Sequence, residues 1–225
     1  METDKDLAEI VVGHGPCSYL LLSLFLILII YPYGIDEGPI GKIVVSVIFS
    51  MILITGSYAT GHNRRSLVFG VALAIVAIIL NWLHFVGPHP IMFRVLSLIY
   101  MIFLSYTIAA VLRYLLVKGP VTADKLHGAL AGFIMLAFLW AFLYTLLEDI
   151  FPHSFNIGTG DIDTANLFYS LLYFSFTTIT SVGFGDIVPI THQARSLVTI
   201  EQLIGVFFVA VLIARLAGLY PPRAE

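Results

Sequence analysis

Long apolar runs that carry almost no charge constrain this chain more than any other feature. A helix needs roughly 20 apolar residues to cross the hydrocarbon core of a bilayer. Six runs of about that length are present, at residues 10–35, 43–63, 66–93, 95–112 (extended to 117 past Arg113), 126–147 and 195–220. We therefore expect six membrane-spanning helices.

The composition supports a membrane protein and excludes several other classes. Of the 225 residues, 59% are apolar and 11% are charged, whereas soluble domains average about 25% charged residues. So few charges could not cover a water-exposed globule. The net charge of −3 does not suit a nucleic-acid-binding protein. The one cysteine, Cys17, excludes a disulfide within the chain and a cysteine-rich metal site.

One stretch between the fifth and sixth runs is too short to cross the membrane. Residues 167–176 are mostly apolar, and a polar run rich in Thr and Gly follows them. An apolar length of about ten residues suits a re-entrant half-helix. Irregular backbone is tolerated at membrane depth only where it is buried in protein or lines water. We therefore expect an aqueous pathway beside this segment.

The polar run at residues 177–186 contains the groups that carry the chemistry. A dehydrated cation needs other oxygens in place of its water, and backbone carbonyls serve if several point at one axis. This requires alternating left-handed and right-handed backbone conformations, and glycine adopts the left-handed one at little cost. Gly183 and Gly185 stand at alternate positions, and the Ser181 hydroxyl can add a further oxygen layer.

This run resembles the selectivity filter of the potassium channel family, whose signature is Thr-Val-Gly-Tyr/Phe-Gly-Asp. The resemblance extends over residues 126–220. It implies an all-α membrane protein with six transmembrane helices, a re-entrant pore helix and a filter, assembled as a homotetramer around a central pore. The filter residues whose carbonyls would coordinate K⁺ are Ser181, Val182, Gly183, Phe184 and Gly185. The ion sites would lie at the first four of these residues.

The resemblance also implies residues that support the filter and a hinge that gates the pore. The expected supporting residues are Tyr173, Phe174, Thr177, Thr178, Thr180 and Asp186, and the expected hinge is Gly205; Glu201 joins the supporting residues for a separate reason, given below.

Three residues depart from the family pattern. Ser181 replaces Thr, Phe184 replaces Tyr, and Phe174 stands where the family often has a Trp. A hydrogen bond that braces the filter from behind is expected to be lost, and an apolar ring contact could replace it. The Tyr173 hydroxyl can still reach Asp186. We expect a filter that is braced less tightly and closes more readily during conduction.

Glu201 is an ionisable residue inside the sixth run. Such groups are costly in a membrane and mark a functional site by default. We expect its carboxylate to hydrogen-bond the region of Thr177 or Thr178 and steady the filter, and its titration would make conduction sensitive to pH. The alternative is a position near the outer boundary, where the carboxylate reaches water.

The fourth run lacks the pattern of a voltage sensor. Such a sensor needs Arg or Lys at every third position through the membrane. Arg94 and Arg113 are nineteen residues apart, near opposite ends of the run. We therefore predict no S4-type voltage sensing.

The distribution of basic residues predicts a cell-membrane protein with both termini in the cytoplasm. Seven acidic residues then face the exterior, as a solvated rim or as a vestibule that concentrates cations. They are Asp36, Glu37, Glu148, Asp149, Asp161, Asp163 and Asp186. Most tyrosines, among them Tyr31, Tyr33, Tyr58, Tyr100 and Tyr144, are expected in an interfacial belt.

We interpret residues 1–120 as a four-helix peripheral domain and residues 121–225 as the pore domain. The predicted function is passive, K⁺-selective conduction, with lipid and K⁺ as partners, no cofactor and no enzymatic step. A nonselective cation channel, a potassium transporter subunit and an intramembrane enzyme or redox protein are the alternatives. The sequence ends at Glu225, so no cytoplasmic ligand-binding domain is expected. The stimulus that opens the pore cannot be deduced from the sequence.

Overall fold

The computed structural model describes residues 15–36, 38–61, 64–87, 89–117, 122–157 and 164–217. Within these residues the regular secondary structure is helical apart from one short strand pair. The helices are α2 (Pro16–Asp36), α3 (Gly38–Ala59), α4 (Arg64–Val86), α5 (Pro90–Leu116), α6 (Ala123–Ile150), α7 (Thr164–Ile179) and α8 (His192–Ala217). Strands β1 (Phe155–Asn156) and β2 (Val188–Pro189) pair antiparallel.

Among the described residues, five helices are long and apolar enough to cross a membrane. These stretches are Ile40–Ala59, Arg64–Val86, Ile91–Leu116, Ala123–Ile150 and His192–Ala214. Two further apolar stretches, Pro16–Tyr31 and Leu167–Ile179, are shorter. The chain is thus a multi-pass membrane protein. The predicted first span corresponds in part to α2, and six crossings stay a prediction.

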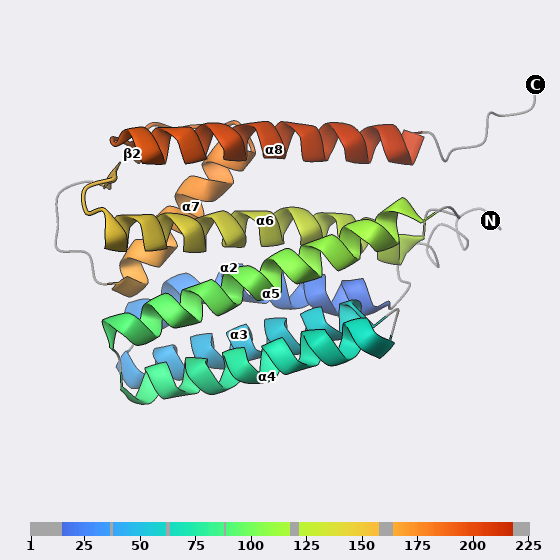
Figure 1. Ribbon diagram of the computed structural model, residues 1–225, viewed down its shortest axis with the longest axis horizontal. Coiled ribbons are helices and arrows are strands. Elements are labelled where there is room, and N and C mark those ends of the chain that lie inside the picture. Colours follow the sequence, from blue (N-terminus) through green and yellow to red (C-terminus); the bar gives the residue numbers. More distant parts are fainter. Residues whose placement is uncertain are drawn as a thin grey trace, which may run out of the picture.

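Helices α6, α7 and α8 form one side of the molecule (Figure 1). Helix α7 lies obliquely between α6 and α8 and contacts both. It begins at the end of the molecule where α6 finishes, and β2 returns the chain to that same end (Figure 1). The segment between α7 and β2 therefore doubles back.

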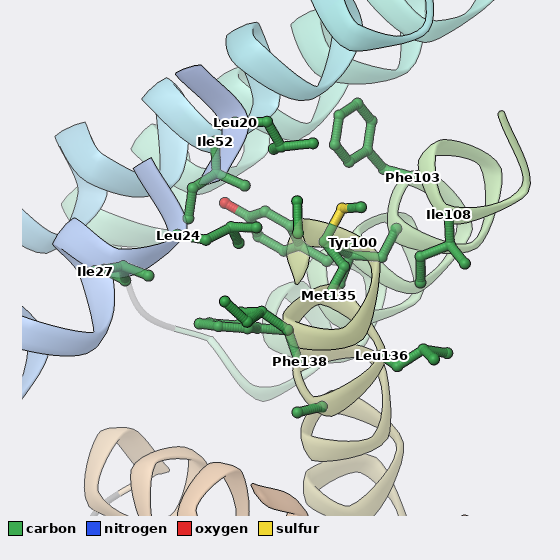
Figure 2. Close-up of a cluster of buried hydrophobic side chains, with 14 of the residues drawn as sticks. Leu20, Leu24, Ile27, Ile52, Tyr100, Phe103, Ile108, Met135, Leu136 and Phe138 are labelled. Atoms are coloured by element: carbon green, nitrogen blue, oxygen red, sulfur yellow. The ribbon is translucent and has the colours of Figure 1, made fainter. Parts of the chain in front are cut away.

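Helices α2 to α5 pack against this group rather than standing apart from it. Helices α2 and α5 both contact α6, whereas α4 contacts only α3 and α5 among the helix pairs with substantial contact. Figure 2 shows the shared core, in which side chains of α2, α3, α5 and α6 meet. Its labelled members include Leu24, Ile52, Tyr100 and Phe138.

Aromatic rings extend this core as far as α7. The Tyr100 ring of α5 stacks on Phe142 of α6, with centroids 5.0 Å apart and an interplanar angle of 7°. Phe142 in turn lies 4.5 Å from Phe168 of α7. Tyr31 of α2 stacks on Tyr169 of α7 at 5.7 Å. Helix α2 therefore braces α7 directly, and α5 braces it through α6.

The interfacial-belt interpretation is wrong for three of the tyrosines. Tyr31, Tyr100 and Tyr144 are buried, with 6%, 4% and 0% of their surface exposed. Their rings fill the space between helices, where other aromatic side chains offer edge and face contacts. Tyr33 and Tyr58 are exposed, as a belt requires.

The start of α6 fixes the ends of two neighbouring helices. The Asp124 carboxylate accepts a hydrogen bond from the backbone N–H of Cys17, in the first turn of α2, at 2.9 Å. The adjacent Lys125 ammonium donates to the carbonyl of Val117, just past the end of α5, at 3.2 Å. Each charge complements the dipole of the helix end that it meets and satisfies a terminal backbone group.

We predict that Phe142→Ala weakens the contact between the first four helices and α6–α7. The substitution leaves a cavity among Tyr100, Phe168 and the neighbouring rings. We expect a loss below the roughly 3–5 kcal/mol typical of soluble cores, because apolar groups gain little from leaving lipid. Thermal unfolding in nanodiscs measures it. Phe151→Ala, at an exposed position just after α6, is the control, and equal losses for both variants would contradict the prediction.

Candidate ion-conduction site

Helix α7 ends in a Schellman motif that turns the chain into residues 181–186, the filter segment. The N–H of Ser181 donates to the carbonyl of Thr178 at 2.9 Å, and the N–H of Val182 donates to the carbonyl of Thr177 at 2.8 Å. Ser181 has φ +60°, the left-handed conformation that closes such a helix end. The N–H of Gly183 adds a second bond to Thr177, at 3.1 Å.

These hydrogen bonds determine where the carbonyls of the filter segment point. In a trans peptide the C=O and the N–H point in opposite directions. The N–H groups of Val182 and Gly183 both point at the Thr177 carbonyl at the end of α7. The carbonyls of the same peptide units, those of Ser181 and Val182, therefore both point away from α7. Two successive carbonyls on one side is what a carbonyl-lined path requires.

The backbone of the segment alternates in handedness. Gly183 and Gly185 have φ values of +56° and +81°, in the left-handed region. A Cβ added at either glycine would meet no atom within 4 Å, so the requirement for glycine here is conformational. The left-handed Ser181 extends the alternation by one position. A β-branched residue is a conformational outlier at such a φ, which gives a physical reason for Ser in place of Thr.

Two aromatic residues and Asp186 meet at the end of the filter segment. The Tyr173 ring stacks on the Phe184 ring at 6.3 Å with an interplanar angle of 2°. The Tyr173 hydroxyl faces the Asp186 carboxylate, whose Oδ1 accepts a hydrogen bond from the N–H of Ile187 at 3.1 Å. The structure thus brings together Tyr173, Phe184 and Asp186, three of the residues that the sequence predicts in or beside the filter.

Phe174 contacts a different part of the molecule. Its ring lies 5.6 Å from Tyr144 of α6 and 5.5 Å from Phe155 of β1. It therefore holds α7 against α6 and the loop that follows α6, while the ring contact to the filter segment comes from Tyr173. The neighbouring threonines Thr177 and Thr178 are both buried.

The loop after α6 holds the chain that leaves the filter segment. Strand β1 pairs with β2, with Phe155 opposite Pro189. The N–H of Ile190 donates to the carbonyl of Ser154 at 2.7 Å. Both ends of the filter segment are therefore anchored, one by α7 and the other by this pairing. The sequence offered no signal for these two-residue strands.

Besides Asp186, two more of the seven predicted outer carboxylates have structural partners. Glu148 accepts from the backbone N–H groups of His153 and Phe155, at 2.7 and 3.0 Å. Asp149 forms an ion pair with Arg94, with Nε 2.5 Å from Oδ2. These contacts favour a structural role for both over a vestibule. Glu37, Asp161 and Asp163, and the side chain of Asp36, lie outside the described residues.

Glu201 is completely buried between α6, α7 and α8. Its Oε2 lies 2.5 Å from the Tyr144 hydroxyl, and its Oε1 lies 2.5 Å from the Ser175 hydroxyl. The partner on α7 is therefore Ser175 rather than the expected Thr177 or Thr178. Ser175 lies nearer the start of α7, and Glu201 lies opposite it. The boundary alternative is wrong, since the side chain does not reach the surface.

Neither partner of Glu201 is predicted by the sequence. Tyr144 was predicted to lie in an interfacial belt, and Ser175 was one hydroxyl among several on α7. A buried carboxylate needs hydrogen-bond donors, and this need is the one indication in the sequence that Glu201 has polar partners. It does not say which of several hydroxyls lies opposite.

Gly205 lets α8 approach the end of α7 closely. A Cβ at this position would clash with the carbonyl oxygen of Ile179. Helix α8 is continuous through Gly205, so the structure gives this glycine a packing role. The hinge stays a prediction.

We predict that Gly205→Ala disrupts the packing of α8 on α7. The added methyl group cannot fit without a backbone shift, and overpacking of this kind costs about 1–3 kcal/mol. Gly132→Ala is the matched control, because its Cβ would be in ordinary contact, 3.5 Å from Phe208. Thermal stability in nanodiscs and K⁺ flux into liposomes measure both variants. Equal effects of the two substitutions would contradict the assigned contact.

Comparison with known proteins agrees with this geometry. A protein family described as "Ion channel" matches residues 130–220. The potassium channel protein kcv of Paramecium bursaria Chlorella virus 1 is 34% identical over 71 residues, which is 31% of this chain and 74% of the relative. No solved structure matches the chain significantly.

The helices and the matched region define a membrane-embedded ion channel rather than an enzyme. More particularly, the chain belongs to the potassium channel family. Among the described residues, no group of three or more His, Cys, Asp or Glu side chains could hold a metal ion.

Proposed function

We propose that the protein conducts K⁺ selectively and passively through a filter of backbone carbonyls. The permeant ion would be coordinated by Ser181, Val182, Gly183 and Phe184, with Gly185 completing the segment. The observation that carries this proposal is the pair of hydrogen bonds from Val182 and Gly183 to Thr177. These bonds turn successive carbonyls away from the helix, to a side where an ion could replace its water with them.

A homotetramer is the assembly that this filter needs. One chain supplies one strand of carbonyls, and a cage around an ion needs about four. In the single chain, Val182 and Phe184 leave 55% and 70% of their surfaces exposed. Helix α8 also exposes Val206, Phe207 and Val211. Three further copies around one axis would cover part of this apolar surface.

Residues 1–120 would then form the periphery and residues 121–225 the pore. The contact of Tyr31 in α2 with Tyr169 in α7, and that of Tyr100 in α5 with Phe142 in α6, support a bracing role for the peripheral helices within their own chain. In this arrangement α7 is a re-entrant pore helix, and both termini lie in the cytoplasm of a cell-membrane protein. Flux is downhill, and no cofactor takes part.

The test of the proposal is the reversal potential of the reconstituted full chain under a K⁺/Na⁺ bi-ionic gradient. We predict a reversal potential close to that of a K⁺ electrode. A value near zero would indicate the nonselective cation channel. Transport without channel-like unitary currents would favour a transporter subunit, and an absence of flux would contradict conduction altogether.

We also predict no S4-type voltage sensing. Helix α5 carries Arg94 near its start, paired with Asp149 of α6, and Arg113 near its end. A sensor moves about three to four charges per subunit through the membrane. A charge–voltage measurement should find fewer than about two per subunit. About a dozen per tetramer would contradict the prediction.

A further inference from the structure

Glu201 sits in a hydrogen-bonded group whose protons can be counted. The group consists of the Glu201 carboxyl of α8, the Tyr144 hydroxyl of α6 and the Ser175 hydroxyl of α7. The Ser175 hydroxyl also lies 2.9 Å from the carbonyl oxygen of Ala137 in α6. Three contacts in hydrogen-bonding geometry therefore join three helices at one buried point.

Three hydrogen bonds require three protons. Tyr144 and Ser175 each supply one, because a hydroxyl has a single O–H. The Ala137 carbonyl can only accept, and an ionised Glu201 can only accept. With Glu201 ionised, the single O–H of Ser175 can donate to Glu201 or to Ala137 but not to both, so one of these two contacts has no hydrogen bond. With Glu201 protonated at Oε1, it donates to Ser175, Ser175 donates to Ala137, and Tyr144 donates to Oε2.

We propose that Glu201 is a neutral carboxylic acid whose proton positions the pore helix α7 between α6 and α8. The effect of this proton on conduction rests on the proposed function. The proton count itself does not depend on that function. Glu201 would act as a positioning residue, because it touches α7 and not the permeant ion.

The surroundings of Glu201 favour the neutral form. The titratable group that faces it from α6 is Tyr144, and α7 presents Ser175, which does not titrate near neutral pH. Along α8, Arg195 lies six residues earlier and donates to the carbonyl of Pro189. On the outer side, Arg94 is paired with Asp149. An unpaired buried carboxylate would be costly.

The position of Ser175 connects this group to the filter segment. Ser175 lies two residues before Thr177, whose carbonyl holds the N–H groups of Val182 and Gly183. Removal of the Glu201 proton would break one of the two bonds that Ser175 makes. Loss of one hydrogen bond changes an equilibrium by up to roughly tenfold. The filter would therefore lose support as pH rises.

The first test is infrared spectroscopy of the full-length protein in lipid at neutral pH. We expect a carbonyl band of a protonated carboxylic acid that Glu201→Gln removes. Glu148→Gln is the matched control, because Glu148 accepts two backbone N–H groups and should contribute ionised carboxylate bands instead. A Glu201→Gln difference spectrum with only ionised carboxylate bands would overturn the proposal, whether or not the protein conducts.

The second test is the pH dependence of K⁺ flux into liposomes. We expect wild-type flux to fall by about tenfold at alkaline pH. Glu201→Gln should show no such fall, because the amide keeps an NH₂ group that donates and an oxygen that accepts, and it cannot be deprotonated. Glu201→Ala should conduct about tenfold less than Glu201→Gln. A wild-type pH profile in Glu201→Gln would overturn the proposal. An absence of wild-type K⁺ flux would instead refute the proposed function.

Discussion

The Thr177 carbonyl, which accepts hydrogen bonds from Val182 and Gly183, is the constraint on which the rest of the site depends. It fixes two peptide planes at once, so that the opposite carbonyls share one direction. That geometry holds only if the end of α7 is itself fixed. The contacts around α7 do this: Gly205 of α8 packs on Ile179, and Glu201 lies against Ser175.

The first four helices contribute to the same constraint through packing. Aromatic rings form an unbroken path from Tyr100 through Phe142 to Phe168 on α7. In lipid, helices associate through close packing and polar contacts rather than by escape from water. The stacked rings and the Arg94–Asp149 ion pair are contacts of this kind. A change in α2, α3 or α5 would therefore alter the packing of α7.

Much of this architecture could be predicted from the sequence. The apolar runs located the helices, with ends that differ from the observed ones by up to seven residues, and the short run at residues 167–176 predicted α7. Gly183 and Gly185 predicted the left-handed positions. The partners of Glu201 could not be predicted, because helical periodicity does not say which faces of α6, α7 and α8 meet. The left-handed Ser181 was also missed, since it follows from the helix-ending hydrogen bonds rather than from the residue type.

The account depends most on where the filter segment lies in the assembled protein. The most direct measurement is a cryo-electron microscopy structure of the full chain in lipid nanodiscs with K⁺ present. The account predicts four chains around one axis, with ion density on that axis between the carbonyls of Ser181, Val182, Gly183 and Phe184. A filter segment that lies away from any shared axis, or is closed within one protomer, would contradict it.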